Sequence, residues 1–189
     1  VHHSPYAKPI KSHLQMQVYS ALAYGAKGIQ YFTYALPKSR IWRFREAIVD
    51  EVGAPTPIYS LVQTLNSEIK QLGTTLWQLK STGVYHSNPV PLDCSAIIPG
   101  LPITKIDGEN ILAGFFTGLG NTKYIMLVNK NYNSGVLGTF YFNKRIKQIT
   151  EIKKNQAKPS EFTWFDTSVE KSCQILLKAG EGKLFKIYD

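Results

Sequence analysis

The second half of the chain consists largely of short runs rich in Val, Ile, Thr, Tyr and Phe, which Gly, Asn and Pro separate. Turn signals stand between the runs, as at Asp107-Gly108, Gly120-Asn121 and Ala179–Gly182. These runs predict strands near residues 82–87, 94–98, 103–107, 110–118, 122–130, 136–143, 147–152, 161–166, 171–178 and 182–188. Many short strands with regular turns are typical of an antiparallel sandwich or barrel. We therefore expect an antiparallel β-sandwich accessory domain over residues 80–189.

The first 79 residues have a different pattern, in which two helices surround one apolar run. Ile10, Leu14 and Val18 follow helical spacing, which predicts a helix over about 10–24 that ends at Gly25. Gly28 to Tyr34 is too apolar to alternate and is predicted as a strand buried on both faces.

A second helix is predicted to begin at Thr56 and Pro57, which suit the N-cap and the first helical position. A lone parallel strand between two helices would have unpaired edges on both sides. Residues 1–79 are therefore predicted to be the C-terminal segment of a larger parallel α/β structure, whose remaining strands lie in upstream polypeptide. The start at Val1 rather than at Met agrees with a processed chain or a fragment.

Charge and hydropathy argue against two classes of partner. The net charge of +9 divides into +5 for residues 1–80 and +4 for the remainder, whereas nucleic-acid binders usually concentrate basic residues on one face. No apolar run approaches the roughly 18 residues that a membrane span needs. We expect neither nucleic acid nor membrane as a partner. Cys94 and Cys173 leave two readings open, one disulfide or two free thiols.

Several segments, in their order along the chain, resemble one enzyme family. They are His2–Tyr6, Leu14–Tyr34, Ala47–Tyr59, Asn66–Ile69 and the tail Leu177–Ile187. The segment LAYGAKGIQYFTY is similar to the last barrel strand and preceding helix of bacterial (β/α)₈-barrel glycoside hydrolases that resemble the family 42 β-galactosidases. The tail resembles the last hairpin of the β-sandwich that follows such barrels.

This resemblance implies an α+β chain: a partial (β/α)₈ barrel end, with its last strand and helices, followed by the sandwich. It implies part of an enzyme that hydrolyses O-glycosyl bonds in an oligosaccharide or polysaccharide, with the remainder of the barrel as partner. Retaining glycosidases use two carboxylates about 5 Å apart. Because no Glu stands near Val1 to His3, where the seventh strand would end, the chain alone is expected to be inactive. No cofactor and no metal are expected, and a secreted or periplasmic location is favoured.

Active sites of such barrels lie at the carboxyl ends of the strands. This position makes a set of residues candidates for lining a sugar pocket, through aromatic stacking and hydrogen bonds. They are His2, His3 and Tyr6 after strand seven, Thr33 and Tyr34 after strand eight, and Trp42 and Arg43 on the same rim. The alternative is that the tyrosines pack the barrel and that the histidines are ordinary loop residues.

Three charged groups allow two interpretations each. The run Lys38–Arg45 either grips an anionic sugar or forms a solvated face with Trp42 turned inward. Glu46 and Asp50 either form a carboxylate pair or make simple ion pairs. The basic residues Lys144, Arg145, Lys147, Lys153, Lys154 and Lys158 either touch nucleic acid or guard sheet edges.

Two other functions compete with the glycosidase segment. The sandwich could be a non-catalytic carbohydrate-binding module that uses exposed aromatic residues such as Trp164 and Tyr132. It could also be a structural or interaction domain with no ligand. Sugar binding by the sandwich separates these two.

Overall fold

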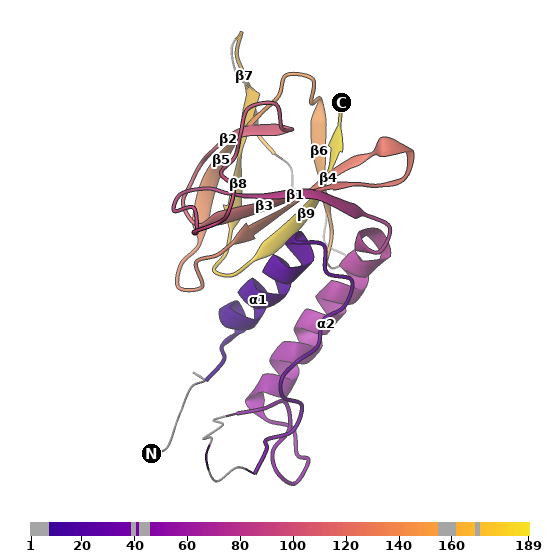
Figure 1. The fold of residues 1–189 in the computed structure, drawn as a ribbon, viewed down its shortest axis with the longest axis vertical. Helices are drawn as coiled ribbons and strands as arrows, with labels where there is room; N and C mark the ends of the chain where they lie inside the picture. The colour runs from indigo at the N-terminus through magenta and orange to yellow at the C-terminus, as the bar shows by residue number, and fades with distance from the viewer. Residues whose placement is uncertain (1–7, 39–40, 42–45, 155–161, 169–170) are drawn as a thin grey trace.

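The computed structural model describes residues 8–38, 41, 46–154, 162–168 and 171–189, and its main feature is a pair of antiparallel sheets (Figure 1). One sheet has five strands in the order β1 (Lys80–His86), β3 (Ile111–Thr117), β4 (Lys123–Asn129), β9 (Gly182–Tyr188) and β6 (Gln148–Ile152). The other has four strands in the order β2 (Ile103–Asp107), β5 (Val136–Phe142), β8 (Lys171–Leu177) and β7 (Trp164–Asp166). A short 3₁₀ turn, η1 (Leu119–Asn121), joins β3 to β4.

The two sheets enclose one apolar core. Side chains that point inward from the four-stranded sheet, such as Phe140 and Ile175, meet Ile125 and Phe185 from the five-stranded sheet. These side chains are at most 2% exposed. Burial of alternate residues from both sheets is what stabilises a β-sandwich, and the predicted sandwich architecture is confirmed.

Two helices cover the other face of the five-stranded sheet. Helix α1 spans Lys11–Ala23 and helix α2 spans Pro57–Leu76. Leu22 of α1 and Leu72 of α2 belong to the same apolar cluster as Leu112 of β3 and Met126 of β4. Both helices lie on one side of the sheets in Figure 1. The molecule therefore has three layers, with the five-stranded sheet in the middle.

The sequence signals at the helix ends are confirmed. The Thr56 hydroxyl accepts a hydrogen bond from the backbone N–H of Ile58, at 3.2 Å, so Thr56 is the N-cap of α2. After α1, Gly25 takes a φ of +97°, which a residue with a side chain rarely adopts.

The predicted barrel end is wrong. The structure is mostly antiparallel sheet, and among the described residues 28–34 form no strand. The only parallel pairings there are two isolated bridges, Ala35 with Val49 and His86 with Ala96. A β-ladder needs a neighbouring strand for its N–H and C=O groups, and none of the described residues between 8 and 79 supplies one. The fold is thus a β-sandwich with two helices rather than a partial (β/α)₈ barrel.

The segment predicted as a barrel strand lies along α2 instead, as the purple trace beside that helix shows (Figure 1). Tyr31 donates a hydrogen bond from its hydroxyl to Oδ1 of Asn66 on α2, at 2.8 Å. Ile29 and Tyr31 pack on the cluster between helices and sheet. Their apolar character, which suggested a buried strand, is thus used in packing against a helix.

Residues 94–98 are a second difference, because the predicted strand there is absent. An isolated bridge between His86 and Ala96 and two backbone hydrogen bonds hold this stretch: the His86 N–H donates to the Ser95 carbonyl at 2.8 Å, and the Cys94 N–H donates to the Pro91 carbonyl at 3.1 Å. The remaining predicted strands agree with the observed ones to within about three residues at either end.

Candidate functional site

The predicted pocket residues that the structure describes, Thr33 and Tyr34, lie near the surface. The Thr33 hydroxyl donates to the carbonyl of Ala35, two residues away. Tyr34 is 63% exposed, and its carbonyl accepts from the N–H of Val49 at 2.9 Å. Neither residue lines the cavities found between the helices and the sheets. The other predicted residues, His2, His3, Tyr6, Trp42 and Arg43, lie outside the described residues.

Glu46 and Asp50 serve separate local roles. Glu46 forms an ion pair with Lys8, with 2.6 Å between Nζ and Oε1. Asp50 accepts hydrogen bonds at Oδ1 from the N–H groups of Val52 (2.9 Å) and Ala54 (2.8 Å), which is the pattern of a turn. Of the alternatives considered for this pair, these contacts fit local ion pairing and turn formation.

The outward face of the four-stranded sheet carries the most promising arrangement. Since Phe140, Phe142, Cys173 and Ile175 point into the core, strand alternation turns their neighbours to the other side. The outward residues are Lys105 and Asp107 on β2, Leu137, Thr139 and Tyr141 on β5, Ser172, Gln174 and Leu176 on β8, and Phe165 on β7.

Tyr141 is the centre of a small polar network on this face. Its hydroxyl donates to Oδ2 of Asp107 at 2.8 Å, and Nζ of Lys105 donates to the same oxygen at 3.0 Å. The Lys105 ammonium also lies 4.6 Å from the centroid of the Tyr141 ring. These hydrogen bonds, from Lys105 first and from Tyr141, lower the pKa of the Asp107 carboxyl. The network fixes the Tyr141 ring and keeps Asp107 ionised.

A second aromatic ring lies two strands away. Tyr141 is opposite Ser172, and Ser172 is opposite Phe165 on the next strand. Two strand spacings place the rings on the order of 10 Å apart. Phe165 is 53% exposed, and Leu137 and Leu176 on the same face are 58% and 54% exposed. Thr139 and Gln174 place a hydroxyl and an amide group on this face, whereas Ser172, between the two rings, is only 8% exposed.

The two aromatic residues that the sequence suggested as sugar contacts have other surroundings. Trp164 packs on the core between the sheets, with its ring 5.1 Å from that of Phe142. Tyr132 is 41% exposed and makes an edge contact with His13 of α1, 4.5 Å between centroids. The neighbouring Phe165 takes the outward place instead. The parity of β7 relative to the core was the signal that could have identified it.

A polar cluster joins the end of α1 to the sandwich. The Lys130 ammonium lies 3.1 Å from Nδ1 of His86, and the Tyr24 hydroxyl lies 3.1 Å from Nε2. An ammonium can only donate, so Nδ1 is the acceptor and the His86 proton is on Nε2. Burial, together with Lys130, lowers the pKa of His86. A neutral His86 thus links Tyr24, at the end of α1, to Lys130, after β4, through its two ring nitrogens.

Cysteines, metal ligands and membrane spans add no further site. Cys94 and Cys173 are both free thiols, and burial raises the pKa of Cys173 to about 12. Among the described residues, no group of three or more His, Cys, Asp or Glu side chains is arranged to hold a metal ion. In the same part of the chain, neither helix has the length and apolarity to cross a bilayer.

Comparisons with known proteins leave the family open. No protein-family model matches the chain, and no curated protein matches it.

Proposed function

We propose that this chain is a non-catalytic carbohydrate-binding module of a glycoside hydrolase, and that the outward face of the four-stranded sheet binds an oligosaccharide. The observation that supports the proposal is that Tyr141 and Phe165 lie on one face of the sheet, with Thr139 and Gln174 on the same face. The resemblance of the chain's segments to family 42-like enzymes supplies the glycosidase context.

The chemistry of the face suits a neutral sugar. The C–H faces of pyranose rings stack on aromatic rings, and sugar hydroxyls exchange hydrogen bonds with polar side chains. Tyr141 and Phe165 provide two stacking positions at a distance that a short oligosaccharide can bridge. Thr139 and Gln174, which are opposite each other on β5 and β8, provide a hydroxyl and an amide group on the same face.

The face is suited to binding rather than to hydrolysis. Glycosidases use two carboxylates, one of which is protonated when it acts as an acid. Asp107 is the only carboxylate among the outward residues named above, and its hydrogen bonds to Lys105 and Tyr141 favour the ionised form. We expect the chain alone to show no glycosidase turnover. Measurable hydrolysis of an aryl glycoside by the purified chain would contradict this.

A glycan array followed by calorimetry with the best oligosaccharide tests the binding face. Tyr141→Ala and Phe165→Ala are each expected to weaken binding by about tenfold, because each removes one stacking ring. Trp77→Ala is the matched control, since Trp77 is 71% exposed at the end of α2, away from this face. It is expected to leave the affinity unchanged.

The outcome separates sugar binding from a purely structural role. No binding to any neutral glycan would favour the structural or interaction domain. An equal loss in Trp77→Ala and Tyr141→Ala would place the sugar elsewhere or reflect a general effect on folding, which a thermal unfolding curve of each variant detects.

A further inference from the structure

A charged cleft lies where the two helices meet the end of β6 and the turn between β8 and β9. It has a volume of about 370 Å³. Five lysines line it: Lys11 of α1, Lys153 and Lys154 after β6, Lys178 after β8 and Lys183 of β9. Three glutamates, Glu68, Glu151 and Glu181, also line it, so the formal charge of the cleft is +2.

Each glutamate is held by a group of the chain itself. Glu68 accepts a hydrogen bond from the hydroxyl of Tyr19, a fully buried residue. Glu151 pairs with Lys153 at 3.2 Å. Glu181 pairs with Lys154 at 3.6 Å and also accepts from the backbone N–H of Lys178 at 2.9 Å.

Among the residues that the structure describes, three of the five lysines have no such partner. Within the described part of the chain, the ammonium groups of Lys11, Lys178 and Lys183 take part in no ion pair. They come from three separate segments that the fold brings to one cleft. A cleft that concentrates unneutralised lysines attracts anions, because close walls strengthen the local potential.

The inner wall of the cleft is rigidly packed. The side chain of Lys154 is 11% exposed, and its ammonium lies 4.4 Å from the centroid of the Tyr19 ring. The start of β9 sits tightly on α1, since a Cβ added at Gly182 would overlap the same ring. This wall leaves the lysines at the mouth of the cleft as the groups that can adjust to a ligand.

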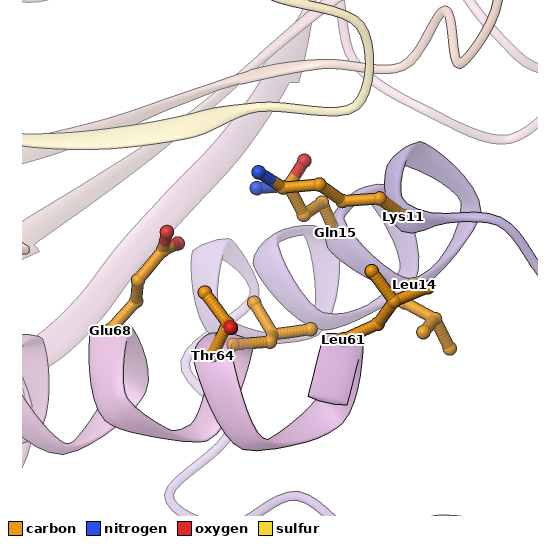
Figure 2. A pocket seen from close by; sticks show the side chains of 7 residues that line it. Lys11, Leu14, Gln15, Leu61, Thr64 and Glu68 are labelled. Atoms are coloured by element: carbon orange, nitrogen blue, oxygen red, sulfur yellow. The ribbon is translucent and has the colours of Figure 1, made fainter. Parts of the chain in front are cut away.

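Figure 2 shows how the helices contribute. Lys11 and Gln15 of α1 and Glu68 of α2 extend on the same side of the helix pair, toward the C-terminal hairpin. These three residues also line a smaller cavity of about 50 Å³ between the helices, whose other walls include Leu14 and Leu61. Gln15 thus adds a neutral amide, which suits a hydroxyl group, beside the cationic Lys11.

We propose that this cleft binds a small oxyanion, a phosphate or sulfate group, either free or carried by a monosaccharide-sized molecule. Lys11, Lys178 and Lys183 contact the anion, and Gln15 contacts a neighbouring hydroxyl. The volume falls in the range of small-molecule sites, which begins near about 300 Å³. Leu176 of the outward face also lines the cleft, whereas Tyr141 and Phe165 do not, so the proposed anion site does not depend on the two aromatic rings.

Isothermal titration of the full chain at constant ionic strength tests the proposal. The probes are sodium phosphate, sodium sulfate, glucose 6-phosphate and glucose. The variant Lys11→Gln with Lys183→Gln removes two of the cationic contacts, and is expected to weaken phosphate binding by at least about tenfold. Lys70→Gln is the control, because Lys70 is an exposed lysine of α2 outside the cleft. It is expected to leave phosphate binding unchanged.

The outcomes are distinct. Tighter binding of glucose 6-phosphate than of phosphate assigns a sugar-borne anion, and equal binding assigns the free ion. Absence of phosphate and sulfate binding by the natural chain would overturn the proposal. An equal loss in Lys70→Gln would do so as well, because it would show a diffuse charge effect. Neutral-glycan binding at the sheet face is measured in the same variants, so that a failure of one site is told apart from a failure of the other.

Discussion

The two sheets of the sandwich have opposite relations to solvent. The five-stranded sheet is covered on both faces, and every residue of β3 from Ile111 to Phe116 is buried. The four-stranded sheet is covered on one face, and β8 alternates between the buried Cys173 and Ile175 and the exposed Gln174 and Leu176. The difference arises from α1 and α2, which pack on one sheet only. It leaves Leu137, Gln174 and Leu176 of the four-stranded sheet exposed to solvent.

The largest expected change in unfolding free energy comes from a residue that packs on the helix-covered face of the five-stranded sheet. Leu72 of α2 is fully buried against the five-stranded sheet, and Leu72→Ala is expected to cost about 3 kcal/mol of unfolding free energy, through lost burial and a cavity. Leu176 is 54% exposed, so Leu176→Ala is expected to change it by less than about 0.5 kcal/mol. Urea unfolding of both variants measures the difference. Similar losses would mean that the outer face of the four-stranded sheet is also covered.

A second prediction concerns how closely α1 approaches the sheet. Gly114 of β3 has no room for a side chain, because a Cβ there would overlap the backbone carbonyl of Ala23 in α1. Gly114→Ala is expected to destabilise the chain by about 2 kcal/mol, since backbone atoms cannot move aside as a flexible side chain does.

Gly73 of α2 is the matched control for this substitution. Nothing lies within 4 Å of a Cβ added there. Gly73→Ala is therefore expected to stabilise the chain by about 0.5–1 kcal/mol, through helix propensity. Thermal unfolding of both variants gives the sign of each effect. A neutral Gly114→Ala would show that α1 can move away from β3 at little cost.

The sequence predicts the sandwich and the helices well but not the sites. The strands after Lys80 and the N-cap at Thr56 are predicted correctly, because both depend on residues that are close together in the sequence. The sequence predicts a strand over residues 28–34, but the structure shows none there. An apolar run of this length is compatible with a buried strand and equally with a segment that packs on a helix, so the sequence pattern does not distinguish the two. The charged cleft is lined by both Lys11 and Lys183, which are far apart in the sequence, and a local sequence pattern does not predict that such distant residues lie together.

The two sheets also differ in how their titratable groups respond to acid. His86 is the last residue of β1 in the five-stranded sheet and is 4% exposed. Its pKa is lowered mainly by burial and also by the positive charge of Lys130. The folded state therefore favours neutral imidazole. Its contribution is fully present above the unfolded pKa of about 6.5, and is lost as pH falls through that value toward the folded pKa. We expect the urea midpoint to fall between pH 7.5 and pH 5.

His86→Gln isolates this residue, because the amide can still accept from Lys130 and donate to Tyr24 but does not titrate. The variant is expected to reduce the dependence of the urea midpoint on pH, whereas His13→Gln, on α1, is expected to retain it. If the urea midpoint depends on pH equally in the natural chain and in His86→Gln, another group causes the loss of stability at low pH.

The smallest effect is expected at Asp107, on the open face. Its lowered pKa means that the folded state favours the carboxylate, so its contribution is present above the unfolded pKa of about 3.8 and is lost as pH falls through the folded pKa. Because Lys105 and Asp107 are largely exposed, solvent and salt screen their ion pair, and Asp107→Asn is expected to cost less than about 0.5 kcal/mol at pH 7.

Unfolding of Asp107→Asn, Tyr141→Phe and the double variant, at low and high salt, measures the coupling between the two side chains. A loss above about 1 kcal/mol that persists in high salt would indicate a desolvated network. In that case the outer face of the four-stranded sheet would be covered like its counterpart, and the two sheets would no longer differ in the way that favours a ligand on this face.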